Sequence, residues 1–600
     1  RRLRGDRSRT GGTGGSDAGM NATDFPADAP DAPDDLDAAF PFDLPPLVEG
    51  DPVDVVILGA GVNGAGLFRD LCAQGVNCLI VDRGDFGGGA SAAGSRLIEG
   101  GLAELEIGDL TGARQAASER NRLLKNAPHF VDMLPVMFPV FSWLGGVGAA
   151  LATLFGTPTA PRQRGAILAR LGLALHDRFA AAPVDTPRHQ LLSRQAAGAT
   201  FPELASGITA AGLYQDARIT APERLVYELV KDGLEACPDS RAANWTRLLS
   251  CFGGGLSFES EDGTDFAVRP TLVVNAAGPW IDEVNAVLGA PEALIAGRRQ
   301  CHILLDHEVL RRQLDGRVLR FEMAGDGRVL TAQDYLGRVL VGATDAPADD
   351  PDEARCPDDD IAAMLDALRA VLPDLDFAAD QVVCTYARTV PSPAPDEATG
   401  QTPRPGGSMP VMEADEDRPF PILSLVGGRF TTYRQFAETA TDAILQRLQR
   451  SRIQSTEHTA IGGGRNYPGN PLARSVWLAE ASVATWLDEP RLETLLERYG
   501  TTALSIAHHI CDHVDADRLP DARSVSLREI DWIARNEDVV RLEDIVLRRL
   551  NLGVAGLFTA RDIEVIAIVA ASALKWSPER RAAEIEAVTT LLRERRRMRI

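Results

Sequence analysis

Three glycines and one aspartate give this chain its clearest chemical signal. Gly59, Gly61 and Gly64 follow the pattern G-x-G-x-x-G, and Asp82 comes about 20 residues later, where a ribose hydroxyl needs a carboxylate. In such a pattern the first glycine permits a tight turn, the second lets the backbone approach a pyrophosphate, and the third lets a helix pack closely on a strand. The spacing therefore predicts that this segment binds a dinucleotide.

The flanking sequence supplies the elements that must position these residues. Residues 55–58 form an unbroken apolar run, as expected for a strand buried on both faces of a parallel sheet. A predicted helix follows the glycines, and its free N–H groups and partial positive charge favour a pyrophosphate. Residues 76–81 form a second predicted strand, which ends at Asp82. This order makes the glycine pattern far more specific than it is alone.

Length, charge and cysteine spacing limit the class of protein. A chain of 600 residues is long enough for two or three domains. A net charge of −23 argues against a nucleic-acid partner and disfavours attraction to anionic lipid. The eight cysteines are scattered without a C-x-x-C pair, which is typical of free thiols in a reducing compartment. We therefore expect a cytoplasmic protein without a metal centre.

Composition divides the chain into three regions. Residues 1–50 are rich in Arg, Gly and Ser and then in Asp, Ala and Pro, which predicts a disordered leader without a secretory signal. Residues 51–470 alternate predicted strands, helices and Pro/Gly turns, as in a mixed α/β enzyme. Residues 471–600 contain few glycines and repeat apolar residues at helical spacing, which predicts a separate helical domain.

The stretch 134–161 contains no charged residue and is long enough to span a bilayer. Prolines and glycines interrupt it, so a strand followed by a short apolar helix fits better than a membrane span. Such a helix could dip into one leaflet as a monotopic anchor, or it could pack in the core. Both alternatives stay open.

Further sequence blocks extend the pattern beyond the nucleotide turn. They are the small-residue-rich block 87–102, VNAAGPW at 274–280, GATD at 342–345, GGRFTTYR at 427–434, and the blocks 216–225, 533–537 and 542–549. Together, and in their order along the chain, these blocks resemble the FAD-dependent glycerol-3-phosphate dehydrogenases. The resemblance runs from about residue 53 to the C-terminus, and the last two blocks resemble that family's C-terminal cap.

The resemblance implies FAD as the cofactor and an α/β fold. That fold is an FAD-binding Rossmann-like domain of the glycine/D-amino-acid oxidase type, with an inserted β-rich substrate domain and a C-terminal helical domain. The residues implied to bind FAD are Gly59, Gly61, Asn63, Gly64, Asp82, Arg83, Ser91, Ser95, Arg96, Ala276, Gly278, Gly428, Arg429, Phe430 and Thr431. The last four would open a helix whose dipole stabilises negative charge on the reduced flavin.

The resemblance also implies a reaction, the oxidation of sn-glycerol 3-phosphate to dihydroxyacetone phosphate. A base would take the hydroxyl proton, hydride would pass to the flavin, and a quinone would later collect the electrons. This activity would place the protein in the cytoplasm, with peripheral contact to the inner face of the cytoplasmic membrane. The residues assigned to catalysis are Glu99, His302, Arg388, Arg429 and Arg434.

The chain departs from that family where the substrate should bind. A His-Gly-Gly-Leu-Arg-Tyr run is replaced by residues 99–104, so that Glu99, Ala103 and Glu104 stand where the family has histidine, arginine and tyrosine. Arg388 could take over the role of the missing arginine, although it lies two positions earlier than the arginine of the family's Gly-Val-Arg-Pro motif. Fewer cations and two added carboxylates disfavour a buried phosphate dianion.

These departures leave several alternatives open. The base could be Glu99, with its pKa raised near the flavin, or His302, although a lone histidine on a strand is more often structural. Glu99 and Glu104 could instead bind a cationic or amine substrate. The rival functions are a dehydrogenase of another polyol phosphate, hydroxy or amino compound, and a flavin-binding protein without turnover. No residue pattern indicates an oligomeric state.

A cluster of histidines near the C-terminal end suggests a metal but lacks the pattern for one. Its members are His508, His509, Cys511 and His513. Since no carboxylate pattern accompanies them, we interpret them as a polar stretch of the helical domain.

Overall fold

The structure is a computed structural model. It describes residues 51–143, 165–179, 187–204, 207–323, 328–348, 350–395, 408–413, 418–511 and 517–600. The predicted leader (1–50), most of the uncharged stretch (144–161) and His513 therefore lie outside the described residues. Residues 134–140 of the uncharged stretch belong to a strand, as predicted for the start of this stretch.

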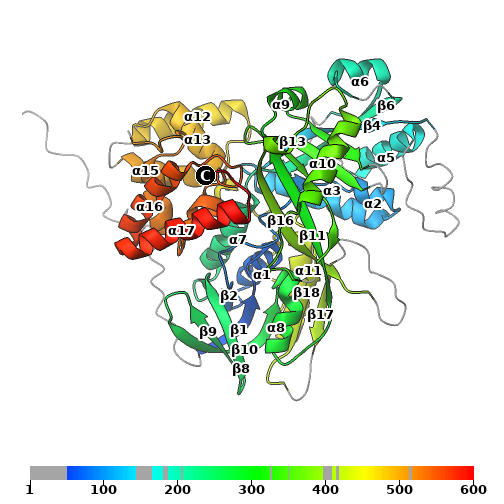
Figure 1. The fold of residues 1–600 in the computed structure, drawn as a ribbon. Helices are drawn as coiled ribbons and strands as arrows, with labels where there is room; N and C mark the ends of the chain where they lie inside the picture. The colour runs from blue at the N-terminus through cyan, green and yellow to red at the C-terminus, as the bar shows by residue number, and fades with distance from the viewer. Residues whose placement is uncertain are drawn as a thin grey trace, which may run out of the picture. The chain divides into compact units, whose positions relative to one another are not determined.

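An eight-stranded sheet carries the predicted nucleotide turn (Figure 1). Its main path runs β17-β18-β10-β1-β2-β7, and the strands from β18 to β7 are parallel. The strands are β1 (Asp51–Leu58), β2 (Cys78–Val81), β7 (Arg241–Ala243), β8 (Thr246–Phe252), β9 (Gly255–Ser260), β10 (Asp265–Asn275), β17 (Ser408–Glu413) and β18 (Ile422–Gly427). The apolar run predicted as a strand at 55–58 lies in β1.

Both faces of this sheet are covered, which explains why β1 is apolar at successive positions. On one face, Val55 and Ile57 pack with residues of α1 (Val62–Ala73), α7 (Pro222–Ala236) and α11 (Tyr433–Arg447). On the other face, Val56 and Leu58 pack with β8, β9 and the end of α8 (Ile281–Val287). β2 begins two residues later than predicted, because the N–H of Val76 donates to Leu71 at the end of α1.

A second, ten-stranded sheet is the inserted β-rich domain, with the path β15-β11-β14-β13-β12-β4-β6-β3. Its strands are β3 (Leu97–Ile98), β4 (Val131–Val140), β5 (Gln190–Ser193), β6 (Ala210–Ile219), β11 (Ile295–Leu305), β12 (Val318–Glu322), β13 (Val329–Tyr335), β14 (Arg338–Gly342), β15 (Ala346–Pro347) and β16 (Val382–Pro393). The helices packed on it are α2 (Leu102–Glu106), α3 (Leu110–Asn126), α5 (Ala166–Phe179), α6 (Arg194–Thr200), α9 (Glu308–Leu314) and α10 (Asp358–Val371).

Helices form the C-terminal part of the described chain (Figure 1, yellow to red). They are α12 (Pro471–Thr485), α13 (Glu489–Tyr499), α14 (Ala503–Cys511), α15 (Leu527–Asn536), the π-helix η5 (Asp544–Arg549), α16 (Ala560–Leu574) and α17 (Pro578–Glu594). Leu492, Ile506 and Ile530 form their core. The predicted fold class is confirmed, whereas the boundary at residue 471 stays a prediction. None of the described helices combines the length and apolar character needed to cross a membrane.

Candidate functional site

The turn between β1 and α1 brings backbone atoms so close together that its first and last glycines cannot carry a side chain. Gly59 has a φ of 106°, and a Cβ on it would lie 2.6 Å from the carbonyl oxygen of Ala276. A Cβ on Gly64 would lie 1.9 Å from the carbonyl oxygen of Gly59. At Gly61 a Cβ would lie 3.3 Å from Ser91 Oγ. The glycine spacing is thus required by the geometry of the turn.

Asp82 closes this turn at the end of β2. Its carboxylate accepts hydrogen bonds from the N–H groups of Ala60 (2.7 Å) and Gly84 (2.9 Å). Burial raises the pKa of Asp82 to about 6, although these two N–H groups act to lower it. The neighbouring Arg83 is exposed, and its guanidinium lies 4.4 Å from the ring centroid of Trp280.

Asn63 and Ser91 connect the start of α1 to two other parts of the predicted cofactor site. Ser91 Oγ accepts a hydrogen bond from Val62 N (2.9 Å), and Asn63 Nδ2 donates to Gly427 O (3.0 Å). Gly428, with a φ of 102°, has no room for a Cβ because Asn63 Nδ2 would lie 2.6 Å from it. Asn63 Oδ1 is buried without a hydrogen-bond partner. An unpaired acceptor beside a glycine turn and the Asp82 carboxylate fits the binding of a dinucleotide.

The remaining predicted cofactor residues lie around this turn. Ala276 donates its N–H to Leu58 O at the end of β1 (2.8 Å), and Gly278 opens the short helix that follows. Thr431 is buried in the turn before α11, and the ring of Phe430 packs edge-on against Tyr433 in that helix. The structure therefore brings the first glycine turn together with the 276–278 and 427–431 turns.

Arg96 and Ser95 hold the loop between β2 and β3 against the second sheet. The buried guanidinium of Arg96 makes two hydrogen bonds to Glu223 (2.8 and 2.7 Å) and a third to Ala92 O (3.0 Å). The carbonyl oxygen of Ser95 accepts from Gln333 Nε2 (2.6 Å). These contacts fix the small-residue-rich loop.

Arg388 and His302 are brought together by the pairing of β11 with β16. Arg388 donates to Gln300 Oε1 (3.1 and 2.8 Å) and to the carbonyl oxygen of Ala90 (3.0 Å). Burial, together with the nearby positive charge of Arg96, lowers the pKa of Arg388 to about 10. A Cβ on Gly94 would lie 3.0 Å from Arg388 Nη1. Arg388 therefore supports the 90–94 segment directly.

His302 is a buried, neutral imidazole. Its ring stacks on Tyr386 with the centroids 5.2 Å apart, and neither ring nitrogen has a hydrogen-bond partner. Burial, with the positive charges of Arg388 and Arg96, lowers the pKa of His302 well below its usual range. The neutral ring therefore offers one acceptor nitrogen and one N–H donor, neither of them engaged, to a small molecule that reaches it.

Of the two acidic residues that replace the family's pattern, Glu104 pairs with an arginine, and so does Glu106 in the same helix. Glu104, buried in α2, forms an ion pair with Arg429 in the turn before α11. Glu106, close behind it in the same helix, binds the buried Arg320 of β12 through two hydrogen bonds (2.9 and 3.1 Å). Glu99 is exposed. Each of the two arginines thus already has a carboxylate partner.

A further buried carboxylate lies under the altered segment and was not assigned a role from the sequence. Asp216 of β6 accepts from Gly100 N (2.8 Å) and from Arg120 Nη1 (3.1 Å). Burial raises its pKa to about 7; the charge of Arg120 opposes this rise, and the charge of Glu99 adds to it. The block 216–225 was part of the resemblance, but no spacing within it indicates that Asp216 meets Gly100.

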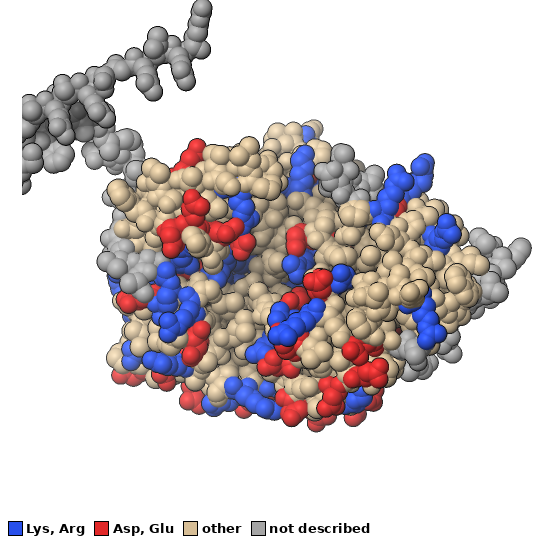
Figure 2. All heavy atoms as spheres, turned by 90° about the horizontal axis from the view of Figure 1, so that it is seen from above, with Lys and Arg blue, Asp and Glu red and all other residues tan. Residues whose placement is uncertain are grey.

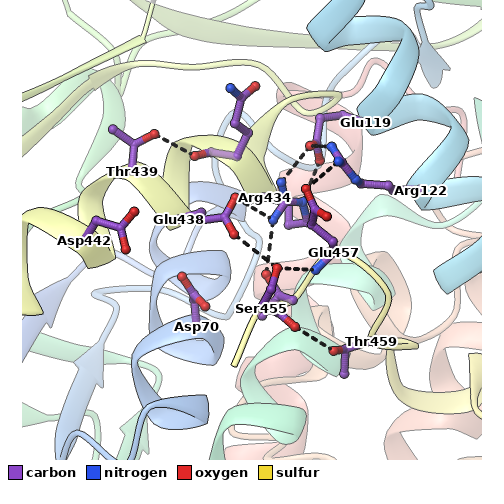
Figure 3. A network of polar contacts seen from close by, with 12 residues as sticks. Asp70, Glu119, Arg122, Arg434, Glu438, Thr439, Asp442, Ser455, Glu457 and Thr459 are labelled. Atoms are coloured by element: carbon purple, nitrogen blue, oxygen red, sulfur yellow. Dashed lines mark hydrogen bonds and ion pairs between the residues drawn. The ribbon is translucent and has the colours of Figure 1, made fainter. Parts of the chain in front are cut away.

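Arg434 lies in a separate charged network (Figure 3). Its Nε and Nη2 donate to the two carboxylate oxygens of Glu119 (2.8 Å each), and its Nη1 donates to Glu438 (3.1 Å). Arg122 pairs with the same Glu119 and with Glu457. Arg434 makes these hydrogen bonds between α3, α11 and the 455–459 segment, and not with Arg388 or His302. Its predicted role at the substrate stays a prediction.

The described residues contain no group of three or more His, Cys, Asp or Glu side chains that could hold a metal ion. Within the histidine cluster, His509 bonds to Asp531 (3.0 Å).

A surface cavity of about 220 Å³ is lined by Arg69, Asp232, Glu235 and Arg465, among others, and ion pairs already join these four residues.

Comparison with known proteins places the chain in a family. A family model described as "FAD dependent oxidoreductase" matches residues 54–409, and one described as "C-terminal domain of alpha-glycerophosphate oxidase" matches residues 454–581. The glycerol-3-phosphate dehydrogenase of a Synechocystis species is 27% identical over 489 residues, which cover 78% of this chain and 80% of that protein. Glycerol-3-phosphate dehydrogenase 1 of Mycobacterium tuberculosis is 26% identical over 565 residues, or 88% and 96% of the two chains.

A solved structure shares the fold. The glycerol-3-phosphate dehydrogenase from Bacillus halodurans, complexed with FAD, superposes with a TM-score of 0.69 at 20% identity and covers 90% of this chain and 95% of its own. The resemblance read from the sequence blocks is thereby confirmed. The chain belongs to the family of FAD-dependent oxidoreductases, and its cofactor is FAD.

Proposed function

We propose that this protein oxidises the secondary hydroxyl of sn-glycerol 3-phosphate to dihydroxyacetone phosphate and passes the electrons to a quinone. The observation that carries this proposal is the match, across both the oxidoreductase region and the C-terminal region, to proteins named glycerol-3-phosphate dehydrogenase. Bound FAD supplies a hydride acceptor for the alcohol carbon.

The residues proposed to hold FAD are those around the three turns. Gly59, Gly61, Gly64 and Asp82 would hold the ADP half, and Asn63 Oδ1 offers a free acceptor beside it. The loop residues Ser91, Ser95 and Arg96 would line the pyrophosphate and flavin, with Arg83, Ala276, Gly278 and residues 428–431 around them. For Asn63 the assignment is supported by its unpaired Oδ1. For the other residues it is supported by the geometry of the turns and by the resemblance to the family.

Of the two candidates for the base, His302 has the better support. Its ring is buried with both nitrogens unpaired, so one nitrogen is available as an acceptor for the hydroxyl proton. The positive charge of Arg388, close enough to lower the pKa of His302, can stabilise an alkoxide as the proton leaves. Glu99 is exposed, so water can solvate its carboxylate. His302→Asn should lower kcat about 100-fold or more, whereas Glu99→Gln should change it little.

The reductive half-reaction tests the proposal directly. Anaerobic titration of the FAD-loaded protein with glycerol 3-phosphate should bleach the visible flavin absorbance. Dithionite serves as the control that the flavin can be reduced. If dithionite bleaches the flavin and saturating glycerol 3-phosphate does not, this substrate is excluded.

A second candidate substrate class is favoured by the ion pairs of the altered segment. Glu104 occupies Arg429 and Glu106 occupies Arg320, so a phosphate dianion would have to compete with a carboxylate for each guanidinium. Glu104 Oε2 is buried without a hydrogen-bond partner, which suits a hydroxyl or ammonium donor. This observation favours an unphosphorylated hydroxy or amino compound.

Glu104→Gln separates the two candidates. If the pocket takes a phosphate, removing this charge should lower the KM for glycerol 3-phosphate several-fold. If it takes an amino alcohol, the wild type should be reduced by that compound, and Glu104→Gln should weaken this reduction at least tenfold. Glu308→Gln, an exposed glutamate on α9, is the matched control and should change neither.

Access to a quinone would require contact with the inner face of the cytoplasmic membrane. Four exposed apolar side chains, Phe141, Trp143, Ile167 and Leu171, lie on either side of residues 144–164 in the sequence, and they support such a contact. Leu171→Asp should reduce co-sedimentation with phosphatidylcholine vesicles. Val309→Asp, which alters an exposed apolar residue on α9, should not. Equal binding by both variants would argue against this face.

A further inference from the structure

Two consecutive arginines of the C-terminal region bind a carboxylate three residues beyond the nucleotide-binding aspartate. In η5, Arg548 Nε lies 2.6 Å from Asp85 Oδ2, and Arg549 Nη1 and Nη2 lie 2.6 and 3.0 Å from the two oxygens of Asp85. Asp85 and Arg549 are almost fully buried, and Arg548 is 7% exposed. Asp85 and the two arginines therefore form one buried charge cluster, although Arg548 and Arg549 lie 463 and 464 positions after Asp85 in the chain.

The surroundings fix this cluster on both sides. Arg549 also donates to Glu537 O through Nε (3.2 Å) and Nη2 (3.0 Å), and Asn244 Nδ2 donates to Asp85 Oδ1 (2.9 Å). Burial alone would raise the pKa of Asp85, but the charges of Arg549 and Arg548 lower it to about 2. Asp85 is therefore ionised at neutral pH and bound by two guanidinium groups.

The backbone connects Asp85 directly to the cofactor turn. Gly88 N donates to Asp85 O (3.0 Å), and Gly87 N donates to Ala60 O (2.9 Å) inside the G-x-G-x-x-G sequence. Ala60 N in turn donates to Asp82 Oδ2 (2.7 Å). A displacement of Asp85 would therefore reach both the glycine turn and the ribose-binding carboxylate through three hydrogen bonds.

We infer that Arg549, assisted by Arg548, is a positioning residue for the ADP half of FAD: the C-terminal helical region holds the 82–88 turn in its binding conformation. The inference depends on the cofactor alone and is independent of the substrate proposed above. It assigns the helical region a part in cofactor retention. Loss of Arg549 would leave Asp85 with one guanidinium in a buried site and allow the turn to shift.

The test measures the affinity of reconstituted apoprotein for FAD, by flavin fluorescence, and for ADP, by calorimetry. Arg549→Gln should raise the Kd of both ligands at least tenfold, and by similar factors, because the turn faces the ADP half. Arg549→Lys should restore part of this loss. In a double-mutant cycle, adding Asp85→Asn to Arg549→Gln should raise the Kd of FAD little further, because both substitutions remove the same ion pair.

The matched control breaks another buried ion pair of the helical region. Arg491 binds Glu529 (2.8 Å) and Ser526 (3.0 Å), both within the C-terminal helices. Arg491→Gln should lower thermal stability by an amount similar to Arg549→Gln and change the FAD Kd less than twofold. An equal loss of FAD affinity in both variants, or no loss in either, would overturn the inference.

A milder variant keeps the test decisive if Arg549→Gln does not fold. Asn244→Ala removes one hydrogen bond to Asp85 from a half-buried position and leaves both arginines in place. It should raise the FAD Kd about threefold. An unchanged Kd in a folded Asn244→Ala protein would count against the positioning role.

Discussion

Two aspartates three residues apart show how partners decide the charge of a buried carboxylate. Burial acts to raise the pKa of both Asp82 and Asp85. Asp82 has only backbone N–H partners, and its pKa remains raised at about 6, whereas two arginines lower that of Asp85 to about 2. The two residues therefore respond to different ranges of pH.

This difference predicts how FAD affinity depends on pH. An ionised Asp82 accepts more hydrogen bonds than a protonated one, so the FAD Kd should be constant above about pH 7. It should rise by up to about tenfold per pH unit as Asp82 becomes protonated below about pH 6. Fluorescence titrations between about pH 5 and pH 8 would measure this. Asp82→Asn should bind FAD weakly at every pH and lose the break near pH 6; a break that persists in this variant would assign it to another group.

At the scale of elements, the contact between α1 and β1 depends on one glycine. Alanine is normally favoured over glycine within a helix by about 1 kcal/mol. At Gly64 this gain cannot be realised, because the new Cβ would lie 1.9 Å from the Gly59 carbonyl oxygen. Gly64→Ala should therefore yield protein without bound flavin, as judged by the absorbance ratio at 450 and 280 nm, wavelengths of roughly the flavin and protein maxima.

The control is the same substitution in another helix. A Cβ on Gly198 in α6 would have no atom within 4 Å beyond its chain neighbours and its own helix backbone, so Gly198→Ala should retain flavin. Its free energy of unfolding should stay equal or rise by about 0.5–1 kcal/mol. Flavin loss in both variants would mean that helix geometry, and not the close approach at Gly64, is responsible.

The elements around the nucleotide turn were predictable from sequence, because local patterns determine them. The apolar run at 55–58, the glycines and Asp82 indicate their own positions, and β1, α1 and β2 follow from them. The pairs Glu104–Arg429, Glu119–Arg434 and Asp85–Arg549 were not predictable. The two residues of each pair lie hundreds of positions apart in the chain, and no spacing within one sequence indicates which arginine meets which acid.

At the scale of the whole molecule, buried and exposed charges both act against the fold as pH rises. Burial raises the pKa values of Asp82, Asp216 and Asp544 to about 6, 7 and 6. A carboxyl whose folded-state pKa is raised favours the folded state below its unfolded pKa, and this contribution is lost as pH rises through the folded value. The net charge of −23 adds a general repulsion at pH 7.

Salt should separate these two contributions. In Figure 2 acidic and basic side chains are interspersed over the visible face, where solvent and ions reach them. Asp216 and Asp544 are almost fully buried, and Asp82 is half-buried. Urea unfolding of the apoprotein should therefore give a free energy that falls between about pH 5 and pH 7, by at most about 1.4 kcal/mol per pH unit for each titrating carboxyl. Sodium chloride at about 0.5 M should remove the part due to surface repulsion and leave the buried part, since screening acts mainly on exposed charges. If the free energy of unfolding became independent of pH in salt, the three carboxyls would not make the predicted contribution to its pH dependence. Added FAD should reduce the remaining slope, because it stabilises the ionised form of Asp82 and leaves Asp216 and Asp544 unchanged.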